Sequence, residues 1–75
     1  MASLPSVTGA EAIRAFQKLG FEVVRTKGSH HILKKQEHRD LLTVPVHGND
    51  PLKNGLLRSL IRGAGIDVET FVSLL

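Results

Sequence analysis

The sequence predicts an α+β fold in which one helix is followed by three strands and two further helices. Near both ends of the chain, apolar residues recur every three or four positions, as in helices that bury one face. Residues 21–46 are rich in β-branched residues that alternate with polar ones, which favours strands. A three-stranded antiparallel sheet with both main helices on one face is the economical way to bury these patterns. The other face of the sheet is then open to a ligand.

The first helix is expected over residues 8–19, after a short flexible tail over residues 1–7. Thr8 as N-cap and Glu11 three residues later form the pattern of a capping box. Gly20 ends the helix, because glycine adopts a left-handed conformation at little cost. The buried stripe of this helix comprises Ala12, Ile13, Phe16 and Leu19.

Three strands are expected, over residues 21–26, 30–35 and 41–46. Gly28 and Ser29 supply the turn between the first two, and a polar segment over residues 36–40 connects the second to the third. Because proline cannot donate to a strand ladder, Pro45 indicates an edge strand or a bulge near the end of the strand. One face of the third strand carries Leu42, Val44 and Val46.

Two helices are expected after the loop that follows the third strand. Asp50 or Asn54 can cap the first of them. Its apolar face comprises Leu56, Leu57, Leu60, Ile61 and Ala64. Asp67 caps a short last helix, where Ile66 and Phe71 fall at the two positions of a hydrophobic staple.

Length and composition limit the class of protein. A chain of 75 residues without cysteine predicts one small domain over residues 1–75, with no disulfide and no thiolate metal site. No apolar run approaches the roughly 20 residues that a membrane helix needs. The first residues lack the basic and apolar regions of a signal peptide. We therefore expect a soluble cytoplasmic protein.

Positive charge is concentrated in two stretches, although the formal net charge is only +3. Residues 25–39 contain one acid, Glu37, among Arg25, Lys27, Lys34, Lys35 and Arg39. Residues 51–66 contain Lys53, Arg58 and Arg62 and no acid. Such stripes suit the phosphate backbone of a nucleic acid, although a mildly basic, solvated surface is the plain alternative.

The segment with the most chemical content is Lys27-Gly28-Ser29-His30-His31. It places two imidazoles beside a cation and a tight turn between two strands. Imidazole is the side chain that both accepts and donates a proton near neutral pH. Together with a basic surface that holds a polyanion, this segment favours a small ribonuclease. A plain strand histidine is the structural alternative for His31.

Strand periodicity constrains the two histidines. Neighbouring strand residues point to opposite faces, so His30 and His31 are poorly placed to chelate one metal ion, and we expect no metal site. The same alternation puts His31 on the face of Leu33, which has the character of a core residue. Either a bulge at the Gly28-Ser29 turn re-aims His31, or His31 lies at the rim of the sheet.

Several segments, in this order and spacing, match one known family. They are Gly20-Phe21, Arg25-Thr26-Lys27-Gly28-Ser29-His30-His31, Thr43-Val44-Pro45-Val46-His47, Leu52-Lys53 with Gly55, Leu57-Arg58-Ser59-Leu60-Ile61, Ala64-Gly65-Ile66 and Val68-Glu69-Thr70-Phe71. Over about residues 4–75 the chain resembles the HicA-type toxins, also called YcfA-like, of bacterial toxin–antitoxin pairs. The resemblance implies a messenger-RNA interferase with a double-stranded-RNA-binding-like fold and no metal or cofactor. It also implies a HicB-type antitoxin that covers the active face.

The resemblance also implies a role for each histidine of the turn. His31 stands two residues after the serine of the family's Gly-Ser-x-His motif and is therefore expected to be catalytic, whereas His30 is accessory. His31 can act as base, acid or both toward a 2′-OH nucleophile and a 5′-oxygen leaving group. His47 is a candidate for the second proton-transfer group, or only bonds the loop backbone.

The expected RNA-binding residues surround this turn. Arg25 and Lys27 are the natural phosphate clamps, and the backbone N–H groups of Gly28 and Ser29 are further anion donors. The rest of the expected RNA-binding set is His30, Lys34, His47, Lys53 and Arg58. With no tyrosine or tryptophan and three phenylalanines, base stacking is poorly supplied, so strong base specificity is not expected. His38 is expected to be solvated.

Two other functions fit the same sequence. One is a non-catalytic RNA-binding module that uses the sheet and the basic helix. The other is an inactive relative that persists as a partner-binding protein and meets DNA only through the antitoxin. In a complex, the antitoxin is expected to bury His31 and to present carboxylates to Lys27, Lys34 or Arg58.

Overall fold

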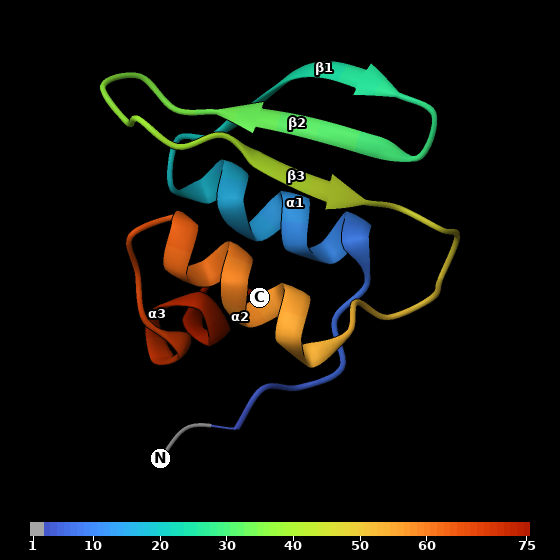
Figure 1. Ribbon diagram of the computed structural model, residues 1–75. Coiled ribbons are helices and arrows are strands. Elements are labelled where there is room, and N and C mark those ends of the chain that lie inside the picture. Colours follow the sequence, from blue (N-terminus) through green and yellow to red (C-terminus); the bar gives the residue numbers. More distant parts are fainter. Residues whose placement is uncertain (1–2) are drawn as a thin grey trace.

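The computed structural model describes residues 3–75 and has the predicted order of elements (Figure 1). The elements are α1 (Gly9–Lys18), β1 (Glu22–Lys27), β2 (His30–Lys34), β3 (Leu42–Pro45), α2 (Asn54–Gly63) and α3 (Val68–Ser73). The predicted α+β fold is confirmed, and α1 and the three strands end within one or two residues of the expected bounds. Within residues 3–75, no helix is long and apolar enough to cross a membrane.

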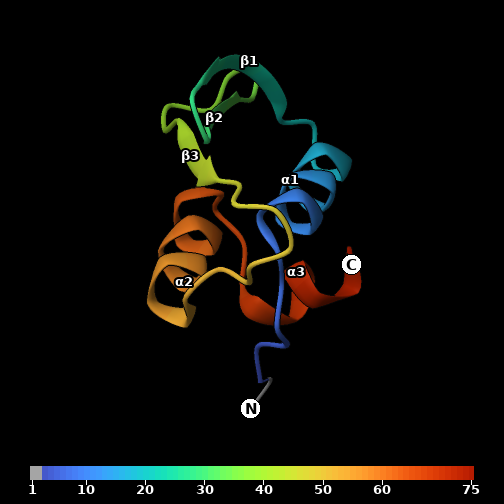
Figure 2. The same cartoon turned by 90° about the vertical axis from the view of Figure 1, so that its right-hand side faces the viewer.

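The sheet is antiparallel, with β2 in the middle and β1 and β3 at the edges. Both α1 and α2 contact β3, and Figure 2 shows the two helices on the same side of the sheet. β1 is the strand farthest from the helices, and all six of its residues are exposed. Pro45 ends the edge strand β3, as predicted.

The predicted caps of α1 and α3 are present. The Thr8 hydroxyl accepts from Glu11 N (3.2 Å), and Thr8 N donates to the Glu11 carboxylate (2.9 Å). The hydrogen bond from the Thr8 backbone, followed by that from its side chain, holds the pKa of Glu11 below its usual value. At α3, Asp67 accepts from Thr70 N (2.8 Å). Hydrogen bonds from the Thr70 side chain and backbone likewise lower the pKa of Asp67.

The predicted cap of α2 is wrong. Lys53 is the N-cap and makes no side-chain cap hydrogen bond, so neither Asp50 nor Asn54 caps the helix. The reason lies just upstream, where Leu52 is buried and its N–H donates to Val7 O (2.7 Å). This bond fixes where the helix begins and leaves Asp50 three residues before the N-cap, out of reach of the first turn.

The core lies between the sheet and the helices. All three phenylalanines are fully buried, and the rings of Phe16 and Phe71 lie 5.3 Å apart between centroids. The aliphatic part of this core includes Leu33, Leu42, Val44, Leu57, Leu60 and Ile61. Leu56, which we expected on the apolar face of α2, is instead 38% exposed.

The expected tail over residues 1–7 falls partly outside the described residues, which begin at Ser3. Val7 is buried, and Leu4 packs against the core. The segment just before α1 therefore belongs to the folded body rather than to a tail.

The start of α1 lies tightly against the end of β3. Gly9 is buried, and a Cβ atom at this position would clash with the carbonyl oxygen of Pro45. Since Pro45 pairs with His30, this close approach sets the position of α1 relative to the His30 end of the sheet.

Replacing Gly9 by alanine should therefore destabilise the protein, although alanine is usually the better helix former. We expect the free energy of unfolding to fall by about 1–3 kcal/mol, as for overpacked cores. Gly55→Ala is the matched control, because nothing lies within 4 Å of its added Cβ and alanine in a helix gains up to about 1 kcal/mol. Urea unfolding followed by circular dichroism measures both. Equal stability of Gly9→Ala and the unaltered protein would contradict the close approach.

Candidate functional site

His31 lies near the end of β2, where it pairs with Thr26 of β1 and Val44 of β3. It shares the helix-facing side of the sheet with Leu33, as the alternation predicted. Leu33 is fully buried, whereas His31 is half-buried. His31 therefore lies at the rim of the core, which confirms one of the two expected placements.

A bulge is present, but not at the turn where we expected it. The regular pairing of β1 with β2 breaks between Val23 and Arg25, so Val24 has no partner in β2. The turn itself is tight, with Gly28 at φ 59°. A bulge shifts all following residues of its strand to the other face. Without it, Arg25 rather than Thr26 would lie opposite His31.

The bulge separates the cations of β1 from His31. Arg25 pairs with Ile32 and Lys27 pairs with His30, so both cations lie on the open face, away from the helices. His30 and His31 point to opposite faces, as predicted. Among residues 3–75, no three His, Asp or Glu side chains come together as metal ligands do. The Gly28-Ser29 turn joins the two strands at the end of the sheet where both histidines lie.

The carbonyl oxygen of Ser29 connects this turn to its surroundings. It accepts from Val46 N (2.8 Å) and lies 3.3 Å from Nδ1 of His31. Because a carbonyl oxygen only accepts, this contact requires the proton of the neutral imidazole to be on Nδ1. Nε2 then carries the lone pair. The end of β3 thus holds the turn, and the turn orients His31.

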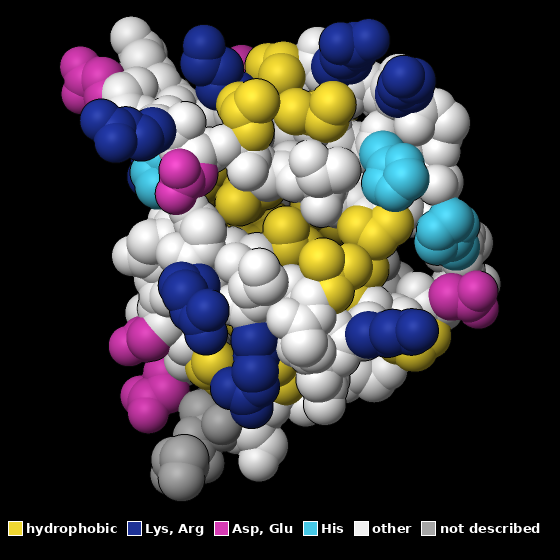
Figure 3. All heavy atoms as spheres, viewed as in Figure 1, with side chains coloured by type: hydrophobic (Ala, Val, Ile, Leu, Met, Phe, Trp, Pro, Cys, Tyr) yellow, Lys and Arg dark blue, Asp and Glu magenta, His cyan; other side chains and the backbone are white. Residues whose placement is uncertain are grey.

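His47 and Lys53 lie at the same end of the sheet. They line one hollow of about 270 Å³ together with Pro45, the partner of His30. Figure 3 shows histidine side chains at this end, with acidic and basic side chains nearby. Arg58 lines a different hollow, of about 260 Å³, together with residues of the α2–α3 connection.

The expected site residues thus divide into two groups. Lys27, Gly28, Ser29, His30 and His31 lie at the turn, and His47 and Lys53 line the hollow beside Pro45, the strand partner of His30. Lys34 lies opposite Glu22 at the far end of β2, and Arg58 lies on α2. Arg25 lies between the two groups on the open face.

His38, which we expected to be solvated, is a structural residue. Its Nε2 donates to Gly63 O (2.8 Å) at the end of α2, and its ring meets the edge of Phe21 at 5.2 Å between centroids. The side chain therefore fastens the β2–β3 connection to the helix layer. The sequence carries no signal for this contact, because the two partners are 25 residues apart.

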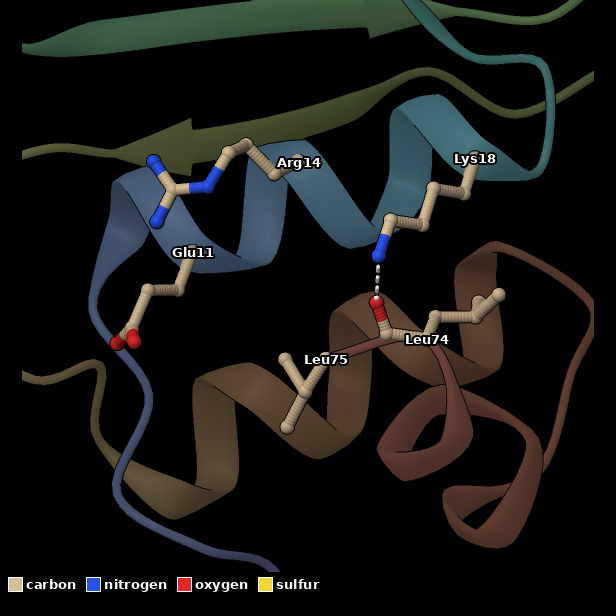
Figure 4. A pocket seen from close by; sticks show the side chains of 5 residues that line it. All are labelled: Glu11, Arg14, Lys18, Leu74 and Leu75. Atoms are coloured by element: carbon tan, nitrogen blue, oxygen red, sulfur yellow. Dashed lines mark hydrogen bonds between the residues drawn. The ribbon is translucent and has the colours of Figure 1, made fainter.

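A further hollow, of about 130 Å³, lies between α1 and the end of the chain (Figure 4). Lys18 Nζ donates there to Leu74 O (2.8 Å), and Glu11 is engaged in the capping box. Glu11 and Lys18 thus hold the start of α1 and the end of the chain in place, and no histidine lines this hollow.

The chain belongs to the HicA toxin family of bacterial toxin–antitoxin systems, because the model of that family matches residues 9–66 of the 75. The match runs from the start of α1 to Ile66 and includes His31, Ser29 and His47. No curated protein matches the chain. Membership in this family implies a cognate antitoxin as partner.

Replacing His38 by alanine should weaken the fold without touching the His31 end of the sheet. We expect the free energy of unfolding to fall by about 1 kcal/mol or more, since Gly63 O loses its donor. His47→Ala, at an exposed loop position, should stay within about 0.5 kcal/mol of the unaltered protein. Urea unfolding of the two variants measures this difference in the free energy of unfolding. Equal stabilities would contradict the structural role of His38.

Proposed function

We propose that this toxin is a metal-independent endoribonuclease that cleaves messenger RNA, with His31 as the proton-transfer residue. The observation that supports the proposal most is the placement of His31 at the rim of the sheet, with Nδ1 directed to Ser29 O. This leaves Nε2 as the atom that exchanges a proton with a substrate. The resemblance of the Gly28-Ser29-x-His31 segment to the catalytic motif of the family supports the same assignment.

The chemistry follows from an imidazole and a 2′-OH. Nε2 of His31 takes the proton of a 2′-OH while that oxygen attacks the adjacent phosphorus. The bond from phosphorus to the 5′-oxygen breaks, and the leaving oxygen takes up a proton. The products are a 2′,3′-cyclic phosphate and a 5′-OH end. General acid–base help of this kind contributes about 10²–10⁴-fold to the rate.

The leaving 5′-oxygen needs a proton donor. His47 is the candidate, because it stands next in the chain to Val46, just after β3. The N–H of Val46 donates to the Ser29 carbonyl that orients His31. If His31 takes the first proton, His47 as imidazolium can give the second. Lys53, which lines the hollow together with His47, is the cation that we assign to the charge that develops on the phosphoryl oxygens.

The open face has a separate part in this proposal. Arg25, Lys27 and Lys34 line it and are exposed. Phosphates bound there attach the RNA without taking part in the reaction, and such binding weakens steeply with salt. The chain would thus bind RNA on one face and cleave it at the rim.

A non-catalytic RNA-binding module is the second candidate. The observation that favours it is the position of the β1 cations on the face opposite His31, since binding there needs no imidazole. In that case His31→Ala would leave both RNA binding and the effect on the cell unchanged.

Cleavage of RNA in EDTA separates the two functions. We expect the unaltered chain to cleave and to leave cyclic-phosphate ends, and His31→Ala to lose at least about 100-fold in rate, since a positioned acid or base contributes that much. End-group analysis of the products identifies the reaction.

His38→Ala is the matched histidine control, assayed at a temperature at which the variant remains folded. It should cleave at the rate of the unaltered chain, because His38 lies at the other end of α2 from the hollow. Intact RNA with every chain, despite binding, would establish the non-catalytic module instead.

We also propose that the cognate antitoxin is of the HicB type, masks His31 directly, and provides the only link to DNA. Carboxylates that imitate RNA phosphates would meet Lys27 at the turn, whereas Lys34 and Arg58 lie outside this end of the sheet. Diethyl pyrocarbonate should modify His31 in the free chain and leave it unmodified in the complex. Equal modification in both states would exclude direct masking.

A further inference from the structure

The hollow beside His47 has an apolar wall of the kind against which a flat ring packs. Its apolar lining includes Pro45, Pro51 and Leu56. Leu56 is 38% exposed, although the neighbouring Leu57 is fully buried in the core. A volume of about 270 Å³ falls just below the range of pockets that hold drug-sized ligands, about 300–1,000 Å³. The space therefore suits one planar ring system rather than a larger molecule.

The rim of this hollow carries both an acceptor and a donor. Asp50 supplies a carboxylate and Lys53 an ammonium group, and both side chains are exposed. A carboxylate repels phosphate, so the part of RNA that it favours is one that presents N–H groups. Guanine has two adjacent N–H donors, at N1 and N2, beside an acceptor at O6. A carboxylate and an ammonium group match this edge better than the edge of any other RNA base.

The hollow also lies at the same end of the sheet as the proposed catalytic residue. Pro45, in its wall, is the direct strand partner of His30. The following residue, Val46, donates to the Ser29 carbonyl that orients His31. A base in the hollow therefore belongs to a nucleotide next to the phosphate that reaches His31.

We propose that this hollow is a base-recognition subsite that takes guanine beside the cleaved phosphodiester. The inference rests on the proposed ribonuclease function and adds a sequence preference to it. It departs from the expectation of weak base specificity, which followed from the lack of free aromatic rings. All three phenylalanines are buried, but the imidazole of His47 offers a flat surface in their place, and the two proline rings offer C–H groups against which a base can pack.

Binding of oligonucleotides that cannot be cleaved tests the subsite. The probes are fluorescent 2′-O-methyl decamers of uridine in which one central base is U, G, A or C, measured by anisotropy with the full chain. We expect the G decamer to bind about fivefold more tightly than the U decamer, which corresponds to a modest net hydrogen bond. Asp50→Asn should bring this ratio close to one.

Asp40→Asn is the matched control, because it makes the same change of charge at an exposed position outside the hollow. It should leave the ratio of G to U affinity unchanged, whatever it does to the affinities themselves. Equal binding of all four decamers, or a G preference that survives Asp50→Asn, would overturn the inference. Equal binding would favour a protein partner, rather than an RNA base, as the occupant of the hollow.

Cleavage of ordinary RNA by the same chain separates this inference from the proposed function. Base-dependent binding without cleavage would overturn the ribonuclease and keep the subsite. Cleavage without any base dependence of binding or of cut sites would support the ribonuclease and overturn the subsite.

Discussion

The pairing register between β1 and β2 is the constraint on which the candidate site depends. Because Val24 is left unpaired, Thr26 lies opposite His31, while Arg25 and Lys27 lie on the open face. A regular ladder would put Arg25 beside the imidazole and move both β1 cations, Arg25 and Lys27, away from the open face. One extra residue in an edge strand therefore separates the surface that we propose binds RNA from the residue that we propose cleaves it.

The Ser29 carbonyl makes a second interaction on which the site depends, at the turn of the β1–β2 hairpin. Its bond from Val46 N joins the turn to β3, and its contact with Nδ1 orients His31. Gly9 brings the start of α1 against Pro45 at the same place. The imidazole thus lies at the edge of the core, half-buried and oriented by a backbone carbonyl that β3 holds in place. A residue that must present one particular nitrogen to a substrate benefits from such support.

Much of the fold could be predicted because local signals determine it. The capping box of Thr8 and Glu11, the cap at Asp67 and the apolar stripes all act within a few residues. The motif residues of the site could be found in the same way. The bulge could not, because no residue of β1 marks it and the competition between two registers decides it. The contact of His38 with Gly63 and the start of α2 after the buried Leu52 depend on tertiary packing, which the local pattern does not contain.

The most direct test of this account is the register itself, measured by cross-strand nuclear Overhauser effects in the free chain. We predict contacts of Thr26 with His31 and of Lys27 with His30, and none that pair Val24 with Ile32. An unbroken ladder, with Arg25 opposite His31, would contradict the account. It would put the cations and the imidazole on one face, and the separation of RNA attachment from cleavage would no longer hold.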